Sequence, residues 1–267
     1  MSDYALALSD AEVARYRFMA QEAARDEADQ WAAAGVVEGA QVADVGCGPG
    51  AMSAVLAQIV GPTGTVHAVD RDPQALSLAR DSATKAGLRN VVFSEGSATA
   101  TGLAPGSVDV AMLRHVLAHN GGREQAIVDH LATLVRPGGS VYLVDIEMTA
   151  ARWHPPENAT AMAEMGERYL RFHSGLGNDL SVGLRLGELL ERAGLEQIDH
   201  RGRYIIMRPP VGMRPPVWAA REQMLAAGVI DDDDIARWQA EFERTDRGEL
   251  GLTMFIPNFI ASARRPS

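Results

Sequence analysis

The chain has 267 residues, with 25 basic and 35 acidic side chains and a formal net charge of −10. A chain this acidic lacks the positive electrostatic potential with which proteins bind the phosphates of nucleic acids. We therefore expect no nucleic-acid partner. Its single cysteine, Cys47, excludes an intramolecular disulfide and a cysteine-rich zinc site, and we expect no metal. It has no apolar run as long as a signal peptide or a membrane span, so we expect a cytoplasmic protein without a membrane partner. The length fits a single domain, 1–267, and leaves a homodimer open.

Residues 9–34 are predicted to form one helix. Its apolar residues recur at three- and four-residue spacing with charged residues between them: Val13, Tyr16, Ala20, Ala24, Ala28 and Trp31. This stripe predicts that the helix packs on the sheet that follows it.

Residues 42–50 combine a short apolar strand, the acidic Asp44 and three glycines at alternate positions. Glycine lets the backbone turn tightly and approach a bound molecule without an intervening Cβ. Asp44, at the end of the strand, argues against a phosphate and for a ligand with a cationic group. A second strand, 65–69, leads to Asp70, where a carboxylate is placed to bind two ribose hydroxyls.

Further strands follow, with predicted helices between them. A third strand at 90–93 precedes Ser97, a fourth strand ends at Arg114, and a turn at 136–139 leads into a fifth strand. Alternating strands and helices are typical of a parallel sheet with helices on both faces. The sequence therefore predicts an α/β fold with a doubly wound, mostly parallel sheet.

From residue 41 to residue 147, these motifs and their order resemble the class I S-adenosylmethionine-dependent methyltransferases of the small-molecule type. The resemblance implies a seven-stranded sheet, with S-adenosylmethionine as the cofactor and S-adenosylhomocysteine as its product. In such a site the 46–50 backbone would hold the methionine part, Asp70 the ribose, and the carbonyl of Arg114 the amino group of the cofactor. The cofactor-binding residues that the resemblance implies are Tyr16, Asp44, Gly46, Cys47, Gly48, Pro49, Gly50, Asp70, Arg71, Ser97, Ala98 and Arg114.

Two observations leave alternatives open. The pattern Gly46-x-Gly48-x-x-Ala51 also satisfies the dinucleotide fingerprint, so a nicotinamide-dependent oxidoreductase stays open, as does a non-catalytic protein that binds S-adenosylmethionine. Ser97 stands where the family often has an aspartate against the adenine, although a hydroxyl can accept the same hydrogen bond. The order of the motifs after the glycine loop favours the methyltransferase.

The second half of the chain adds two segments, 148–180 and 208–248, to the minimal fold. We expect them to form a helical substrate cap, built from insertions, over a cofactor-binding core at 41–147. The first segment supports this with an apolar stripe at helical spacing: Met162, Met165, Tyr169 and Phe172.

The remaining elements are expected between and after these segments. We predict a helix at 184–193 and a strand at 198–207, and we place the aspartates at 231–234 at a helix N-terminus. The last strand is predicted at 252–263, where the family has an antiparallel strand at the edge of the sheet. Pro257 should interrupt it or force a bulge.

Two histidines follow the fourth strand, where substrate and cofactor meet in the family. Methyl transfer from a sulfonium mainly requires alignment in a site cleared of water, and a general base helps when the nucleophile is a hydroxyl or phenol. His115 and His119 are our candidate catalytic bases, because imidazole titrates near neutrality. We expect a small, partly apolar acceptor, a natural-product intermediate methylated on O, N or C, with a quinone or lipid head group as the alternative.

Overall fold

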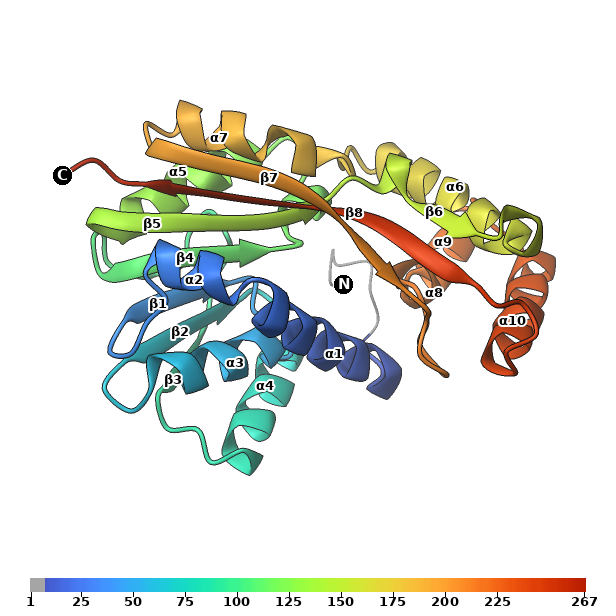
Figure 1. The fold of residues 1–267 in the computed structure, drawn as a ribbon, viewed down its shortest axis with the longest axis horizontal. Coiled ribbons are helices and arrows are strands. Elements are labelled where there is room, and N and C mark those ends of the chain that lie inside the picture. The colour runs from blue at the N-terminus through green and yellow to red at the C-terminus, as the bar shows by residue number, and fades with distance from the viewer. Residues whose placement is uncertain (1–7) are drawn as a thin grey trace.

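The computed structural model describes residues 8–267, and its centre is one eight-stranded sheet (Figure 1). The strands follow the order β3-β2-β1-β4-β5-β8-β6, and β7 also pairs with β8. The strands are β1 (Gln41–Val45), β2 (Thr65–Asp70), β3 (Val91–Glu95), β4 (Val108–Arg114), β5 (Val135–Ile146), β6 (Arg152–His154), β7 (Glu196–Met207) and β8 (Thr253–Arg264). The first five are parallel, and β8 runs antiparallel to its three neighbours. The predicted doubly wound, mostly parallel sheet is confirmed, and the short β6 adds one strand to the seven expected.

Helices cover both faces of this sheet. They are α1 (Asp10–Asp26), α2 (Ala28–Ala34), α3 (Ala51–Val60), α4 (Pro73–Lys85), α5 (Glu124–Leu134), α6 (Thr160–Gly175), α7 (Leu186–Arg192), α8 (Pro216–Ala219), α9 (Arg221–Ala226) and α10 (Asp232–Asp246). Val45 and Leu113 point into a core shared with α5, α6 and α7, whereas Val42 and Met112 point into a core shared with α2 and α3. Alternate residues of the same strands thus enter opposite cores, as a sheet buried on both faces requires.

The single helix predicted at 9–34 is wrong, because the chain forms two helices there. α1 ends at Asp26 and α2 begins at Ala28, with Glu27 between them at φ −118° and ψ 9°. The change of direction lets α2 pack against β5, while the buried Glu27 side chain reaches Arg114 of β4. The break between the two helices thus coincides with a tertiary ion pair, which local periodicity does not contain.

The edge position expected for the last strand is also wrong. β8 pairs with β5 on one side and with β7 on the other, so that β7 forms the edge. Most residues of β7 are exposed, as the residues of an edge strand usually are.

Pro257 neither interrupts β8 nor bulges it, contrary to the prediction. The pairing with β7 runs through Tyr204 and Pro257 without a shift in register. The last residue pair between β5 and β8 is Ile146 with Asn258, and Pro257 lies one position beyond it. The Pro257 carbonyl accepts a hydrogen bond from the Glu147 N–H. A proline fits here because the β5 ladder has already ended on the side that its nitrogen faces.

The turn predicted at 136–139 lies inside β5. The pairing of β4 with β5 shifts between Val108, opposite Val135, and Val110, opposite Ser140. The Pro-Gly-Gly sequence therefore forms an irregularity of the strand and not the turn before it.

A helical lobe extends the molecule at one end, on the right in Figure 1. It contains β6, α6, α8 to α10 and the far ends of β7 and β8. α10 begins at the aspartate run as predicted, with Asp231 and Asp234 forming a reciprocal capping box. The predicted stripe on α6 is buried in the larger of the two cores.

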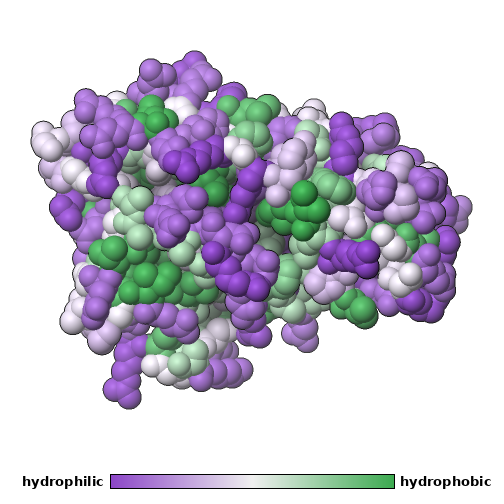
Figure 2. All heavy atoms as spheres, viewed as in Figure 1, coloured by the Kyte–Doolittle hydropathy of each residue, from purple (hydrophilic) through white to green (hydrophobic). Residues whose placement is uncertain are grey.

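Hydrophilic side chains, purple in Figure 2, cover most of the face shown, with hydrophobic patches in green between them. Within residues 8–267, no helix has the length and apolar character needed to cross a membrane.

Candidate cofactor and acceptor site

A cavity of about 370 Å³ lies at the carboxyl ends of β1, β2 and β4, and its walls also include residues of α1 and of the lobe. This is the edge at which open α/β sheets bind their ligands. The predicted site residues that line it are Tyr16, Asp44, Gly46, Cys47, Gly48, Pro49, Asp70, Arg71, Ser97, Ala98, Arg114, His115 and His119. Gly50, which was also predicted to belong to the site, does not line the cavity.

The glycine loop turns tightly, as its sequence predicts, and its three glycines have a left-handed backbone. Gly46 has φ +73°, and a Cβ there would stand 2.5 Å from Val116 Cγ2. Gly48 has φ +54°, and a Cβ built on it would meet no atom within 4 Å, because this residue faces open space. Gly50 instead packs against α4, where a Cβ would lie 2.8 Å from that of Ala79. Gly46 and Gly48 therefore shape the cavity, and Gly50 shapes the packing behind it.

Asp44 places a buried carboxylate beneath this loop. It accepts a hydrogen bond of 2.5 Å from Ser53 Oγ. Burial raises the pKa of Asp44 to about 6, although Ser53 and the charge of Arg114 act to lower it. A nearby ligand cation would favour the ionised form. The site therefore fits a ligand that carries an ammonium or sulfonium group.

Asp70 connects the second strand to the glycine loop. Its carboxylate accepts hydrogen bonds from the Gly48 N–H at 2.7 Å and from the Asp72 N–H at 2.9 Å. A carboxylate has about four acceptor positions, so both oxygens can still receive a diol. The side chain is thus held in the place that a ribose-binding carboxylate needs.

The adenine side of the predicted site is built by a tight turn after β3. Ser97 forms an isolated bridge with Ala100, and its hydroxyl lies 3.2 Å from that of Thr99. Ser97, Ala98 and Arg71 line the same cavity as Asp70. Cys47 is buried against Ala68 and Leu76, and burial raises the pKa of its thiol, so that it behaves as a packed side chain.

A buried charge network that the sequence analysis missed closes the cavity behind Arg114. Glu27 accepts hydrogen bonds from both terminal nitrogens of Arg114, from Arg203 at 3.1 Å, from Tyr142 at 3.0 Å and from Trp31 at 3.2 Å. Burial raises the pKa of Glu27, but the two guanidinium groups and the hydrogen bonds outweigh it and leave the pKa lowered. One signal was present in the sequence, because Glu27 follows Ala20 and Ala24 and precedes Trp31 on the apolar stripe.

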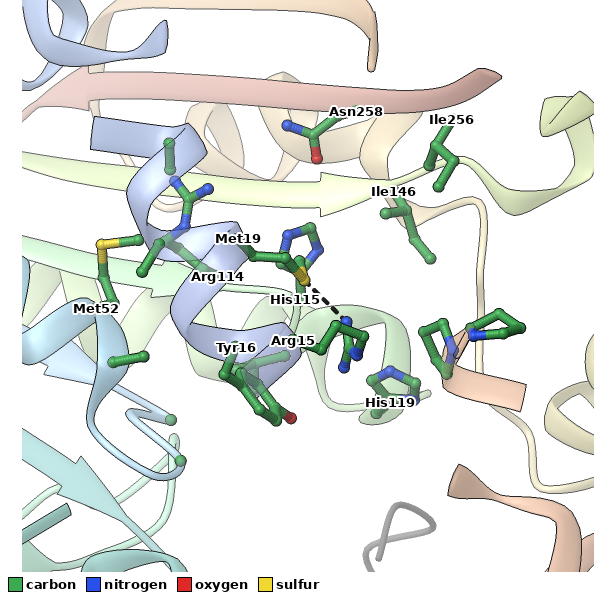
Figure 3. Close-up of a pocket in the computed structure, with 18 of the residues that line it drawn as sticks. Arg15, Tyr16, Met19, Met52, Arg114, His115, His119, Ile146, Ile256 and Asn258 are labelled. Carbon is green, nitrogen blue, oxygen red and sulfur yellow. Dashed lines mark hydrogen bonds between the residues drawn. The ribbon is translucent and has the colours of Figure 1, made fainter. Parts of the chain in front are cut away.

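His115 and His119 both line the cavity, and Figure 3 shows them beside α1, with Arg15 and Met19 nearby. His115 has φ +54°, a left-handed conformation that is uncommon outside glycine and is often found at functional sites. Burial, with the neighbouring Arg114, lowers the pKa of His115 to about 3. Burial, with His173, lowers that of His119 to about 3. Both imidazoles are therefore neutral at physiological pH.

The far end of the cavity is mostly apolar, although Arg152 and Arg214 also line it. The cavity reaches from the glycine loop to side chains of the lobe and of β7 and β8, among them Trp153, Met162, Tyr169, Ile205, Met207 and Ile256. Two members of the predicted α6 stripe, Met162 and Tyr169, therefore reach the cavity, and the other two serve the core. The site has a polar end that fits the cofactor and an apolar end that fits a second molecule.

Comparison with known proteins supports this description. The profile of a methyltransferase domain family matches residues 37–194, more than half of the chain. The fold is that of a class I S-adenosylmethionine-dependent methyltransferase. The chain belongs to this methyltransferase family, whose cofactor is S-adenosylmethionine.

Individual relatives match over shorter stretches. The ubiquinone biosynthesis O-methyltransferase of Cupriavidus pinatubonensis is 34% identical over 169 residues, which make up 61% of this chain and 63% of that protein. The aklanonic acid methyltransferase of Streptomyces sp. strain C5 is 40% identical over 76 residues, or 28% and 34% of the two chains. The chain spans less than two thirds of the length of the curated relatives it matches.

A solved structure shows the same fold. A S-adenosylmethionine-dependent methyltransferase from Aquifex aeolicus superposes with a TM-score of 0.51 at 20% identity, covering 74% of this chain and 93% of that one. At this identity the likeness concerns the fold alone.

Proposed function

We propose that this chain transfers a methyl group from S-adenosylmethionine to a small, partly apolar acceptor of the natural-product type. The observation that carries the proposal is the single cavity, which joins the carboxylates of Asp44 and Asp70 to an apolar wall formed by β7, β8 and the lobe. Methyl transfer requires such an arrangement, because two molecules must meet in one space that excludes water.

Each residue at the polar end of the cavity would bind a different part of the cofactor. The backbone of Gly46 and Gly48 would hold the methionine part, with Asp44 as the counter-charge to its cationic groups. Asp70 would bind the ribose hydroxyls, and Ser97 the adenine. When bound, S-adenosylmethionine supplies a methyl group on a sulfonium that leaves as a neutral thioether.

An aromatic or polyketide-like acceptor fits the apolar end best. Most of the wall there is formed by apolar side chains, among them methionine, isoleucine and aromatic residues, which bind planar apolar bodies of varied shape. The similarity to an aklanonic acid methyltransferase supports this class of acceptor. A quinone head group is the second candidate, because a ubiquinone biosynthesis O-methyltransferase matches the longest stretch of chain among the relatives compared above.

His115 and His119 are the candidates for removing a proton from a hydroxyl or phenol of the acceptor. Both are neutral, so either can accept the proton, but a pKa of about 3 makes each a weak base. We therefore expect positioning of the acceptor to supply more of the rate than proton transfer does.

Identifying the acceptor tests the proposal directly. Protein purified with S-adenosylhomocysteine would be incubated with an extract of small metabolites, and the bound compounds identified by mass spectrometry. Methyl transfer to the captured compound is then measured in a single turnover with labelled S-adenosylmethionine. A chain that binds neither S-adenosylmethionine nor its product would refute the proposal.

The role of the histidines is tested by single substitutions. Replacing a positioned base typically slows the chemical step by about 10²–10⁴-fold. Given the low pKa values, we expect His115→Ala or His119→Ala to lower the single-turnover rate near the lower end of this range, with unchanged cofactor affinity. If both variants keep the wild-type rate, neither His115 nor His119 acts as a base.

A further inference from the structure

The acceptor end of the cavity contains one polar side chain whose hydrogen-bonding capacity is unused. Asn258 of β8 is 1% exposed and lines the cavity. Neither its Nδ2 nor its Oδ1 has a hydrogen-bond partner. In Figure 3 its amide points from β8 toward the space bounded by Met19, Ile146 and Ile256. Leaving a buried amide unpaired is costly, so a native protein that does this usually has a use for it.

The residue paired with Asn258 has one unused hydrogen-bond donor. Arg203 of β7 lies directly opposite Asn258, and it also lines the cavity. Its terminal nitrogens bond to Glu27 and Asp26, but its Nε is buried and has no partner. Two adjacent strands thus present unused hydrogen-bonding groups at neighbouring positions.

Position in the sheet assigns these groups to the acceptor and not to the cofactor. β8 is three strands away from β1, which carries Asp44 and the glycine loop. At about 4.8 Å per strand, this separation is about 14 Å. Beyond Asn258 and Arg203, the next pairs on the same side are Ile256 with Ile205 and Met254 with Met207. The wall therefore changes from polar to apolar within two residues along each strand.

We infer that Asn258, with Arg203 Nε, recognises a carbonyl oxygen and an adjacent hydroxyl on the acceptor, whose apolar body lies along β7 and β8 toward the lobe. A primary amide offers one donor and one acceptor side by side, and this pairs with a hydroxyl–carbonyl unit in either orientation of the amide. Arg203 Nε adds a second donor for the carbonyl. This inference rests on the proposed function and specifies its substrate class.

The test uses two probe compounds that differ in one oxygen. 1-Hydroxy-2-acetonaphthone has the hydroxyl–carbonyl unit, and 2-ethyl-1-naphthol has a methylene in place of the carbonyl. Their dissociation constants would be measured by calorimetry on the complex with S-adenosylhomocysteine. We expect the wild type to prefer the ketone by about tenfold, the effect of one good hydrogen bond, and Asn258→Leu to lose this preference without losing affinity for S-adenosylhomocysteine.

A second measurement needs no ligand. Because the Asn258 amide has no protein partner, Asn258→Leu should melt at or above the wild-type temperature. Asn90→Leu is the matched control, since the Asn90 amide donates to the carbonyls of Ala57 and Gly61 at 2.8 Å, and that variant should melt lower.

The outcomes separate the two proposals. A lower melting temperature for Asn258→Leu would assign the amide a structural role and overturn the inference. Equal affinity of the wild type for both probes, or binding of neither, would overturn the hydroxyl–carbonyl assignment while leaving methyl transfer intact. Failure of the wild type to bind S-adenosylhomocysteine would instead refute the proposed function itself.

Discussion

Glu27 shows how much of this site depends on one residue. It is fully buried and joins α1, α2, β4, β5 and β7 through hydrogen bonds to two arginines, a tyrosine and a tryptophan. Breaking a buried ion pair by removing one partner commonly costs about 3–5 kcal/mol, because the remaining charge stays buried. Glu27 is therefore expected to stabilise the frame on which Arg114 and Arg203 are held.

Substitution of this residue gives the first prediction. Glu27→Gln should lower the free energy of unfolding in urea by about 3–5 kcal/mol, since Arg114 would lose its counter-charge and Arg203 would keep only Asp26. Glu188→Gln is the control, because Glu188 pairs with Arg192 on an exposed face, and its loss should cost less than about 1 kcal/mol. Similar losses in the two variants would contradict this account.

Three histidines with lowered pKa values, the buried His173 and the half-buried His115 and His119, make stability depend on pH. Burial lowers the pKa of His115 and His119 to about 3 and that of His173 to about 4. Since the unfolded chain takes up these protons near pH 6.5 and the folded chain does not, the contribution to stability is present above pH 6.5 and is lost as the pH falls toward 4. Asp44 and Asp145 act in the opposite direction, because burial raises their pKa values to about 6 and about 7.

A single variant isolates one of these histidines. His173 does not line the cavity, so His173→Gln should leave ligand binding unchanged. Between pH 6.5 and 4.5 the free energy of unfolding of this variant should fall less steeply than that of the wild type, by up to about 1.4 kcal/mol per pH unit for the one proton removed. The measurement is urea unfolding at several pH values, and parallel pH profiles would show that the pKa of His173 is the same in the folded and the unfolded chain.

The residues that the sequence could predict share a simple property. Asp44, Gly46 and Asp70 lie at the end of a strand or in the turn after it, and the topology of a parallel sheet brings such positions together without further information. The roles of Glu27 and Asn258 could not be predicted in this way. Glu27 is defined by hydrogen-bond partners that are distant in the sequence, and Asn258 by the absence of any partner. The apolar stripe places Glu27 on the packed face of its helix, but only the tertiary structure shows which groups it contacts.

At the level of elements, the same distinction explains which predictions failed. Strands β1 to β4 and the helix pattern followed from local periodicity. The break between α1 and α2 and the inner position of β8 depend on long-range pairing, which periodicity does not contain. The prediction of an interruption at Pro257 considered only the residue type, whereas the effect of the proline depends on where the neighbouring strand β5 ends.

The two added segments are expected to differ in mobility. α6 buries its stripe in the main core, and Glu164 on this helix pairs with Arg237 of α10. The stretch 209–217, in contrast, lines the cavity with prolines, Met213 and Val217 and contains little regular structure. A segment that closes over a reaction must be less stable than the core.

Hydrogen exchange tests this division. We expect the amides of α6 to be protected in the free protein, and those at 209–217 to exchange fast until S-adenosylhomocysteine and an acceptor are both bound. The amides of α5 serve as a reference for the permanent core. Fast exchange throughout α6 that is suppressed by ligands would show that the whole segment 148–180 moves as a lid. Equal protection of both segments in the free protein would argue against any lid.

For the whole molecule, cofactor binding is linked to folding. A ligand that binds only the folded chain stabilises it by about 2.7 kcal/mol when its concentration is one hundred times Kd. For a chain of this size, that corresponds to a rise in melting temperature of about 5–10 °C. We therefore expect S-adenosylhomocysteine to raise the melting temperature by this amount and NAD to leave it unchanged, because the family and the fold support the first ligand and not the second.

The carboxylate of Asp70 decides the size of this shift. Loss of a hydrogen bond to a charged group costs about 1.5–3 kcal/mol, so Asp70→Ala should lose most of the stabilisation by S-adenosylhomocysteine at the same ligand concentration. The shift, and not the melting temperature itself, is compared, because Asp70 also holds the Gly48 loop. Asp109→Ala is the control: its carboxylate bonds to Gln41 and Arg136, away from the cavity, so the ligand shift should survive. If the ligand-induced shift survives equally in both variants, Asp70 does not belong to the cofactor site. If the shift is lost in both, the loss comes from a general loosening of the sheet and not from a missing contact to the ligand.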